Sequence, residues 1–575
     1  METKKIVSGA SVIANAIYDS GIRTVYMFPG GTIAPLLNEL IALGVEYVCT
    51  RNEQGAGYAA IGAAKISGKP QVVLVTSGPG ATNLLTPVAD AYYDSIPILA
   101  ITGQVGTNDI NHEKKIRQTG FQETDSVGIF KPIVKKASII KSHNKLYEKV
   151  YNSINLTING RPGPVLIDLP MDIQRNPYNE KDSITISKNE VDIIKCKHPS
   201  KKQIIETINS IRCSTRPLLL VGNGIHISDS HSKLLNFVEM TNIPVVATLP
   251  GIGSLNSLHP LQFSFIGHTG EYYANKAFYH SDLIISLGAR LDVRQTGTEL
   301  EHFQEKKLIK IDIDENELLY GRIQGNLNIN TSLPIFFEKF SQEWGDKDSL
   351  DTSKWVEQII DWKNKFNSFK YYEKLDLSSY HVIKAVDLHT QNKTVLVTSG
   401  VGTHQQLVPR YFTFERPKRV WMTSAGHGTM GFDLPTAMGA LIHDKSYDFG
   451  ITFVGDGSFQ MNIQELATIK NYKLPLKIFV LDNSRLGIVS QFQLFNWEKD
   501  ESTGNKINPS FSKIANGYGI KSCDIYKKED ISNVLKNVFS TNKPEVIHCH
   551  VDTEEDVLPM LLAGQKMNEM YPITE

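Results

Sequence analysis

The sequence lacks the features that mark secreted, membrane-spanning and nucleic-acid-binding proteins. Its five cysteines are scattered among 575 residues without a CxxC spacing, so neither a disulfide framework nor a cysteine metal site is expected. No apolar run is long enough to cross a bilayer, and the N-terminus has no signal-peptide core. Lysine and arginine number 60 against 61 aspartates and glutamates, which predicts no basic surface for a polyanion. We therefore expect a cytoplasmic protein with reduced thiols and no membrane or nucleic-acid partner.

No internal repeat is evident, and the chain is too long for one hydrophobic core. Short apolar strands alternate with helical segments along most of its length, which is typical of α/β domains with parallel sheets. A polar stretch at residues 175–198 predicts a linker, and residues 331–372 read as helices and a second linker. We predict three α/β domains, each a doubly wound parallel sheet, at residues 1–180, 195–345 and 375–575.

The most informative stretch runs from Ile451 to Gln493. Two apolar strands, separated by an amphipathic helical segment, end at Gly-Asp-Gly (residues 455–457) and at Asp-Asn (residues 482–483). Parallel strands joined by a helix end at the same edge of a sheet, so Asp456 and Asn483 can face one hard cation. Such a pair suits Mg²⁺ holding a diphosphate. Gly-Asp-Gly alone is more often a plain Rossmann-like turn, but the helix-length spacer and the asparagine turn favour the metal.

The phrases GDGSFQMNIQEL and GIVSQFQ, with the asparagine turn between them, closely resemble the thiamin diphosphate motif of the acetolactate synthase family. The tail VLPMLLAGQKMNEM is similar to that family's ending, so the resemblance covers essentially the whole chain. It implies thiamin diphosphate as cofactor, with Mg²⁺ held by Asp456, Asn483 and Arg485. The resemblance places the cofactor against Pro29, Gly30, Gly31, Pro79, Asn83, Val401, Gly402, Thr403, His404, Gly428, Met430, Gly455, Asp456, Gly457, Ser458, Asn483, Arg485, Gly487 and Ile488.

In the first domain, four predicted strands end in polar or glycine-rich turns, at residues 24–28, 47–50, 71–76 and 98–102. If the strands are parallel with right-handed crossovers, these turns share one edge of the sheet. That edge is a candidate site.

Glu53 follows the second of these strands and precedes a helix of small residues. By itself it reads as a helix-start carboxylate favoured by the helix dipole. However, RNEQGAGYAA is similar to the family's RHEQGA block. This implies that Glu53 bonds the aminopyrimidine ring of the cofactor and takes part in proton exchange. Asn52 stands where the family has histidine, a change that bears on the proton relay or the substrate pocket.

The sequence Phe121-Gln122-Glu123 resembles a family block at the subunit interface near the reacting carbon. The resemblance implies that Gln122 bonds a substrate oxygen and that Phe121 lines the pocket. Read alone, both are ordinary packing residues. Arg117 and Lys131 are either cations for a substrate carboxylate or surface residues. The predicted catalytic residues are Glu53, Gln122 and Phe121.

The second domain has strand ends typical of dinucleotide-binding sheets, although such turns also occur in cofactor-free domains. The segment Gly267–Gly297 is similar to the FAD segment of the family, in which the flavin is largely structural. The resemblance implies FAD contacts from Arg161, Gly222, Asn223, Gly224, Thr248, Leu249, Gly267, His268, Thr269, Gly288, Arg290, Asp292, Arg294, Asp312 and Ile313.

Several residues near the expected cofactor depart from the family pattern. Met430 matches the bulky residue that bends the cofactor into its V shape, but His427 and Asp433 replace leucine and glycine. Ile488 replaces methionine, and Phe492 replaces the tryptophan that shapes acceptor choice in the family. The acceptor pocket therefore differs from that of a standard branched-chain synthase.

The resemblance implies decarboxylation of pyruvate followed by carboligation to a second 2-keto acid, giving 2-acetolactate. One alternative is transfer of the acetyl unit to a keto-sugar nucleotide, and another is a pyruvate oxidase or decarboxylase. A non-catalytic homologue is the third, although the presence of Glu53, Asp456 and Asn483 argues against it. The resemblance also implies a homodimer or homotetramer with active sites between subunits, and leaves open a regulatory small subunit.

Overall fold

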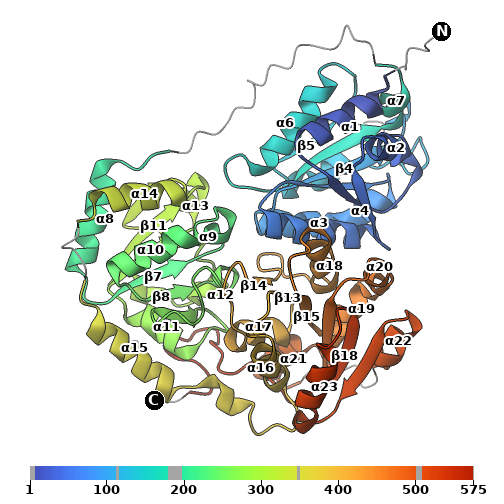
Figure 1. Ribbon diagram of the computed structural model, residues 1–575. Coiled ribbons are helices and arrows are strands. Elements are labelled where there is room, and N and C mark those ends of the chain that lie inside the picture. The colour runs from blue at the N-terminus through green and yellow to red at the C-terminus, as the bar shows by residue number, and fades with distance from the viewer. Residues whose placement is uncertain (1–6, 112–115, 179–196, 346–349, 500–507, 574–575) are drawn as a thin grey trace.

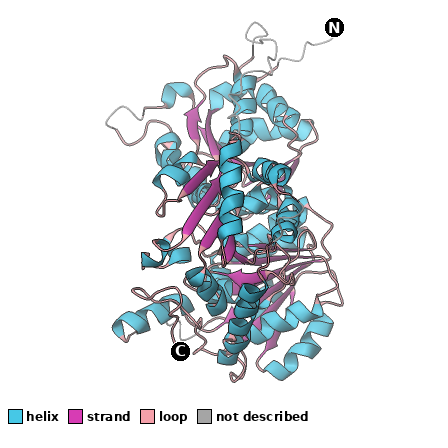
Figure 2. Cartoon of the chain, turned by 90° about the vertical axis from the view of Figure 1, so that its left-hand side faces the viewer, coloured by secondary structure: helices cyan, strands magenta, loops and turns pink. Residues whose placement is uncertain are grey.

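The protein contains three parallel six-stranded sheets that follow one another along the chain (Figure 1). The computed structural model describes residues 7–111, 116–178, 197–345, 350–499 and 508–573. Helices flank the strands of each sheet (Figure 2). The predicted fold class, three doubly wound parallel α/β sheets, is confirmed.

The first sheet has the strand order β2-β1-β3-β4-β6-β5. Its strands are β1 (Thr24–Met27), β2 (Glu46–Cys49), β3 (Gln71–Val75), β4 (Ile98–Gln104), β5 (Lys136–Ile139) and β6 (Val165–Pro170). Its helices are α1 (Gly9–Asp19), α2 (Ala34–Ala42), α3 (Glu53–Ser67), α4 (Pro79–Tyr93), α5 (Ser126–Phe130), α6 (Leu146–Ile158) and α7 (Met171–Arg175). Alternate residues of each central strand enter cores on opposite faces, so both faces of the sheet are buried.

The central sheet has the order β12-β11-β10-β7-β8-β9. Its strands are β7 (Pro217–Val221), β8 (Val245–Ala247), β9 (Gln262–Phe265), β10 (Leu283–Leu287), β11 (Lys307–Asp312) and β12 (Leu327–Asn330). Its helices are α8 (Lys201–Cys213), α9 (Gly224–Ile227), α10 (His231–Thr241), α11 (Tyr272–His280), α12 (Val293–Thr296), α13 (Glu315–Tyr320) and α14 (Leu333–Glu343), and α15 (Ser353–Lys365) follows. Most of the linker predicted at 175–198 lies outside the described residues.

The third sheet has the order β14-β13-β15-β16-β18-β17. Its strands are β13 (Val395–Ser399), β14 (Arg419–Met422), β15 (Phe449–Gly455), β16 (Leu476–Asp482), β17 (Lys521–Ile525) and β18 (Glu545–His550). Its helices are α16 (Ser379–His389), α17 (Thr403–Tyr411), α18 (Asp433–His443), α19 (Asp456–Met461), α20 (Leu466–Asn471), α21 (Gly487–Trp497), α22 (Phe511–Gly517) and α23 (Ile531–Val538).

The first and third sheets are joined through α3 and α18, which pack against each other (Figure 1). Gly62 of α3 lies against the carbonyl of Thr436, and Gly439 of α18 lies against the backbone of Ala59. A Cβ atom at either glycine would overlap the opposite backbone. One apolar cluster runs from the first sheet through these helices to the third sheet.

The single amphipathic segment expected between Gly-Asp-Gly and the next strand is broken in the structure. Helix α19 starts at Asp456, and a 3₁₀ turn separates it from α20. Asn462 interrupts the helix at φ −132°, because its side-chain amide donates to the Gly431 carbonyl and to Gln54. Met461, the last residue of α19, is 51% exposed.

Two other expectations concern the whole chain. Among the described residues, no helix is both long and apolar enough to cross a membrane. The four described cysteines, Cys49, Cys213, Cys523 and Cys549, are free thiols.

Candidate active site

The carboxyl edge of the first sheet carries Glu53. This residue is buried and is the first residue of α3. The side-chain amide of Asn83 donates to its carboxylate at 2.9 Å. Asn52 caps the helix by accepting the Gln54 N–H, so the residue that replaces histidine has a clear structural role. The glutamate is therefore held at a fixed position by two neighbouring asparagines.

The turns after β1 and β3 lie beside Glu53, as the shared sheet edge predicted. Gly30 packs on the side chain of Thr76, and the ideal Cβ of Gly80 would lie 3.6 Å from the Glu53 carboxylate. The predicted cofactor residues Pro29, Gly31 and Pro79 are exposed at this edge.

Gln122 reaches the same edge from the loop after β4. The backbone of Gln122 has φ 65°, and a Cβ on Gly78 would lie 2.9 Å from the Cβ of Gln122. Its neighbour Phe121 is 86% exposed. Buried Glu123 fixes the loop by accepting the N–H groups of Asn111 and Thr119 at 2.8 and 2.6 Å. Phe121 is thus presented outward on a well-anchored loop.

The two candidate substrate cations of this region, Arg117 and Lys131, are both exposed. Neither lines a cavity described below.

The carboxyl edge of the third sheet forms a cavity of about 120 Å³. Every third-domain residue predicted to bind the cofactor lines it, except Gly428. These residues are Val401, Gly402, Thr403, His404, Met430, Gly455, Asp456, Gly457, Ser458, Asn483, Arg485, Gly487 and Ile488. The N–H of Gly428 instead donates to the Ser424 hydroxyl at 3.0 Å.

Asp456 and Asn483 directly follow the neighbouring strands β15 and β16, and both side chains line the cavity. Burial raises the pKa of the Asp456 carboxyl to about 6, and the nearby Asp482 carboxylate adds to the rise. A divalent cation would offset this cost of ionisation. The guanidinium of Arg485 pairs with Asp556 at 2.8 Å. Because a guanidinium has no acceptor for a cation, only the main-chain carbonyl of Arg485 can serve as a metal ligand.

His404 forms the floor of the glycine-rich part of the cavity. Burial lowers the pKa of its imidazole to about 3, so the ring is neutral at pH 7. Among the described residues its Nε2 atom has no hydrogen-bond partner although it is buried. Cβ atoms on Gly402 and Gly455 would crowd the ring at 2.8 and 3.1 Å. The donor set, the unpartnered nitrogen and the bare backbone fit a bound diphosphate and its metal.

Two residues that depart from the family pattern have distinct surroundings. Asp433 is buried, with one carboxylate oxygen accepting the Ser458 hydroxyl at 2.7 Å and the other the Leu434 N–H at 2.8 Å. His427 is exposed and stacks on Tyr93 of the first domain, with ring centroids 5.5 Å apart.

The two predicted acceptor residues lie on α21, next to the cavity. Ile488 lines the cavity, and Phe492, one turn further along, is 55% exposed. Val489 and Trp497 of the same helix are also exposed.

Among the described residues of one chain, the first-domain group lies outside the third-domain cavity. Neither Glu53, Asn83 nor Gln122 lines the third-domain cavity. The turn before α3 is nonetheless tied to the third domain, because the Arg51 N–H donates to Glu465 at 2.9 Å. Each chain thus presents two separate groups, which we call the glutamate half-site and the diphosphate half-site.

A second, larger cavity of about 300 Å³ lies at the carboxyl edge of the central sheet. The strand order reverses between β7 and β10, where dinucleotides bind in such sheets. Every predicted FAD residue lines the cavity except Gly222 and Gly267. Those two glycines lie where a Cβ would overlap the backbone of Gly288 and Arg294, respectively.

Charged groups from two domains enter this central cavity. Burial raises the pKa of Asp312 to about 6. Arg161 of the first domain donates to Asp314 and Glu317 at 3.0 and 3.1 Å, and Arg290 pairs with Asp292 at 2.7 Å. The cavity is therefore built from groups that the sequence places far apart.

Comparison with known proteins agrees with this geometry. Residues 7–129 match the N-terminal thiamine pyrophosphate-binding domain, 204–331 the central domain and 400–549 the C-terminal thiamine pyrophosphate-binding domain of the thiamine pyrophosphate enzymes. The chain is 34% identical to the acetolactate synthase isozyme 2 large subunit of Escherichia coli K12, covering 98% of this chain and 99% of that protein.

The chain belongs to the acetolactate synthase family of thiamine pyrophosphate enzymes. It is 35% identical to the acetolactate synthase large subunit of Lactococcus lactis, over 99% of this chain and 97% of that one. A probable acetolactate synthase large subunit of Methanococcus aeolicus is 34% identical, over 98% and 95%. The protein is therefore an enzyme whose terminal domains bind thiamine pyrophosphate.

Sequence reasoning missed several residues of these sites. Asn508 donates to Asp456 at 2.6 Å, and Glu555, whose pKa burial raises to about 7, lines the diphosphate half-site. Asp94 and Ser95 of the first domain line the central cavity. The sequence carries no local signal for them, because each reaches its site from a distant segment.

Proposed function

We propose that this enzyme decarboxylates pyruvate and joins the resulting two-carbon unit to a second pyruvate, giving 2-acetolactate. The observation that carries the proposal is the pair of half-sites in a chain of the acetolactate synthase family. When bound, thiamine diphosphate supplies a carbon centre that accepts the electron pair left by decarboxylation. The protein contributes binding, orientation and proton transfer.

In this proposal the diphosphate half-site holds the cofactor through Mg²⁺. Asp456, Asn483 and the Arg485 carbonyl provide the oxygen ligands that Mg²⁺ prefers. The neutral imidazole of His404 donates one hydrogen bond to a phosphate oxygen, and the bare backbone at Gly402 and Gly455 lets the diphosphate approach. The Met430 side chain stands next to Gly457 in this half-site, where it would contact the bound cofactor.

The glutamate half-site provides the proton acceptor. Glu53 takes a proton from the cofactor ring and returns it, and the amide of Asn83 keeps the carboxylate oriented. Gln122, anchored at the same edge, hydrogen-bonds the substrate oxygen, and Phe121 covers the substrate. This division assigns proton transfer to one domain and cofactor anchoring to another.

The identity of the acceptor substrate is tested by incubating the purified enzyme with pyruvate, thiamine diphosphate and Mg²⁺. We expect 2-acetolactate to accumulate with pyruvate as the sole substrate. A product that forms only after a keto-sugar nucleotide is added would exclude acetolactate synthesis. Oxygen consumption or acetaldehyde release in place of acetolactate would identify an oxidase or a decarboxylase.

We further propose that each active site joins the glutamate half-site of one subunit to the diphosphate half-site of another. The support is that the two groups lie in separate places within one chain, with exposed apolar residues at both: Phe121 beside one, Phe492 and Trp497 beside the other. Such residues become buried when a partner covers them.

Complementation tests this arrangement. Chains with Glu53→Gln are co-expressed with chains carrying Asp456→Ala, and activity is assayed at a cofactor concentration too low to restore turnover in Asp456→Ala, so that each variant is inactive alone. A mixed dimer with shared sites contains one intact site, so random pairing restores about one quarter of wild-type activity. If each chain built its own site, every site would carry a defect and no activity would return.

We propose that the central cavity binds FAD as a structural cofactor. The strand-order reversal, the close glycine turns and the buried Asp312 support this assignment. Quenching of flavin fluorescence on addition of the apoprotein tests binding. We expect quenching with no absorbance change when pyruvate is added, whereas bleaching of the flavin by pyruvate would indicate a redox role. No quenching would refute the FAD assignment.

A further inference from the structure

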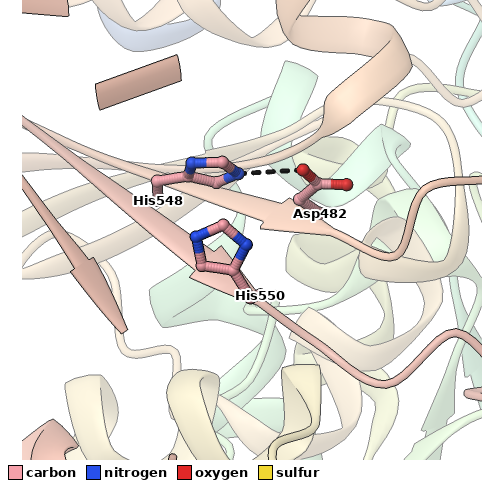
Figure 3. A group of neighbouring side chains, drawn as sticks. All are labelled: Asp482, His548 and His550. Carbon is pink, nitrogen blue, oxygen red and sulfur yellow. Dashed lines mark hydrogen bonds and ion pairs between the residues drawn. The ribbon is translucent and has the colours of Figure 1, made fainter. Parts of the chain in front are cut away.

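A group of metal-type ligands that the proposed reaction does not use lies at the carboxyl end of the third sheet. Asp482 ends β16, and His548 and His550 lie on the neighbouring strand β18 (Figure 3). The parallel register places Asp482 opposite His550. The two histidines are two residues apart and therefore project from the same face of the strand. One ligand atom from each residue lies within 4.8 Å of the others.

The carboxylate of Asp482 is already oriented for a ligand. One oxygen accepts the Ser484 N–H at 2.9 Å and the Asn508 amide at 2.8 Å. The other oxygen faces Nε2 of His548 at 2.8 Å. The carboxylate is therefore held in a fixed orientation beside the histidines.

Asp524 on β17 stands behind both histidines. It lies 3.3 Å from Nδ1 of His548 and accepts from Nε2 of His550 at 3.0 Å. In Figure 3 the two imidazole rings lie side by side, and a ring nitrogen of His548 faces the Asp482 carboxylate. A carboxylate behind a histidine, with the other ring nitrogen free for a cation, is the usual arrangement of a protein metal site.

One atom of this group is left unsatisfied without a cation. Nδ1 of His548 is buried and, among the described residues, makes no hydrogen bond of acceptable geometry, although Asp524 is within ion-pair distance. A cation on Nε2 would fix the tautomer that carries its proton on Nδ1 and direct it at Asp524.

We propose that Asp482, His548 and His550 bind a divalent transition-metal ion of the Zn²⁺ type. Two neutral imidazoles and one carboxylate suit Zn²⁺ and its neighbours, whereas Mg²⁺ takes oxygen ligands. The carboxylates of Asp482 and Asp524 together balance the two positive charges. His550 and Asp524 are about one-third exposed on their side chains, at 33% and 28%, which leaves a path for the ion to enter.

The proposed ion is distinct from the Mg²⁺ of the diphosphate half-site but is linked to it by one side chain. The amide of Asn508 donates to Asp482 at 2.8 Å and to Asp456 at 2.6 Å. The two sites therefore present different donors, nitrogen-rich and oxygen-only, on either side of one asparagine. The inference rests on this geometry and on no step of the proposed reaction.

The test uses the full-length protein, stripped of metals by chelation and then dialysed against Zn²⁺ in a large excess of Mg²⁺. We expect one tightly held Zn²⁺ per chain by elemental analysis. The variant His550→Gln should lower Zn²⁺ affinity at least about tenfold. It changes a part-exposed side chain, so circular dichroism should report an unaltered fold. The matched control His443→Gln removes an exposed histidine elsewhere in the third domain and should retain the ion.

Co²⁺ provides a second readout, since its visible absorption reports nitrogen ligands directly. We expect a ligand-field spectrum in the wild type and in His443→Gln that is lost in His550→Gln. Equal Zn²⁺ and Co²⁺ binding by wild type and His550→Gln would overturn the site. Displacement of Zn²⁺ by Mg²⁺ at millimolar concentration would also overturn it, because the ion would then belong to the diphosphate half-site. Neither outcome depends on turnover, so the proposed function is tested separately.

Discussion

The first and third sheets have the same strand order, counted along the chain, but different chemistry at their carboxyl edges. In the first sheet the carboxylate follows the second strand, at Glu53. In the third sheet a carboxylate that lines the cavity, Asp456, follows the third strand. The corresponding turn of the first sheet, Ser77-Gly78-Pro79, carries no charge. The shared topology brings strand ends together, and the residue at each end decides what the edge can bind.

The comparison extends to the helices that join the two sheets. Helix α3 follows the second strand of the first sheet, and α18 follows the second strand of the third sheet. Both begin with a buried acidic residue, Glu53 in one and Asp433 in the other. Asp433 has both oxygens bonded within its own domain, while Glu53 lies at an edge beside the exposed Asn83. Equivalent positions therefore serve packing in one half and, in our proposal, proton transfer in the other.

The largest effect should come from Glu53→Gln. The amide keeps the shape of the side chain but cannot accept a proton, so we expect turnover to fall about 10²- to 10⁴-fold. Thiamine diphosphate affinity should be unchanged, because the diphosphate half-site is intact. Steady-state kinetics and cofactor titration measure the two quantities.

The matched control is Glu46→Gln, which neutralises an exposed glutamate on β2. It should keep full turnover. Wild-type turnover in Glu53→Gln would remove the glutamate half-site from the mechanism, and a parallel loss of cofactor affinity would make Glu53 a binding residue.

Asp456→Ala should have the opposite effect, a loss of cofactor affinity with turnover that can be recovered. Removing this carboxylate takes away the charged ligand of the proposed Mg²⁺. The affinity for Mg²⁺ and thiamine diphosphate should therefore fall by about 10- to 100-fold. Saturating cofactor should recover much of the turnover. Isothermal titration at several Mg²⁺ concentrations provides the measurement. Asp361→Ala, on the exposed face of α15, serves as the control, and equal affinities in the two variants would contradict the metal assignment.

How far the fold could be predicted depends on where each strand lies in its sheet. The interior strands β1, β3, β15 and β16 were predicted, because buried strands read as continuous apolar runs. The strands β5, β9, β12 and β14 were not predicted, and all four lie at sheet edges; the edge strand β2 is the exception, since a strand was predicted at residues 47–50. An edge strand has neighbours on one side only, so its sequence is short and mixed; β5 has no fully buried residue.

The candidate site divides in a similar way. Residues such as Asp456 and His404 were predictable because a strand end and a glycine turn mark their places in the sequence. Asn508 was not, since it follows no strand and reaches Asp456 only in the folded chain. The His548 and His550 group depends on the pairing of β16 with β18, which a single sequence does not specify.

The contact between α3 and α18, which joins the first and third sheets, should be broken by Gly439→Ala. The added Cβ would overlap the backbone of Ala59 on α3, and backbone cannot move aside cheaply. We expect the free energy of unfolding to fall by about 1–3 kcal/mol, with weaker association of the two terminal domains. Denaturant unfolding followed by circular dichroism measures this loss.

The control for this contact is Gly517→Ala, in α22, where a Cβ meets nothing within 4 Å. Alanine is the better helix former, so this variant should be stabilised by up to about 1 kcal/mol. Equal effects of the two substitutions would show that the glycine contact does not hold the domains together.

The smallest effect is expected from Asp433→Asn, a change in stability that tests how Asp433 differs from Glu53. Burial raises the pKa of Asp433 from 3.8 to about 6, so the folded protein binds this proton more tightly than the unfolded chain. Its contribution to stability is fully present below about pH 4 and is lost as pH rises through about 6. Asp433→Asn should therefore be more stable than the wild type at pH 8, by up to about 2 kcal/mol, and should gain much less at pH 5.

Urea unfolding of the cofactor-free protein at the two pH values measures this difference. The control Asp361→Asn removes an exposed carboxylate and should show the same small change at both pH values. If Asp433→Asn is destabilised at pH 8, the hydrogen bonds from Ser458 and Leu434 outweigh the burial of the charge. Asp433 would then be an ionised anchor at the start of α18, and the difference from Glu53 would lie in hydrogen bonding rather than in protonation.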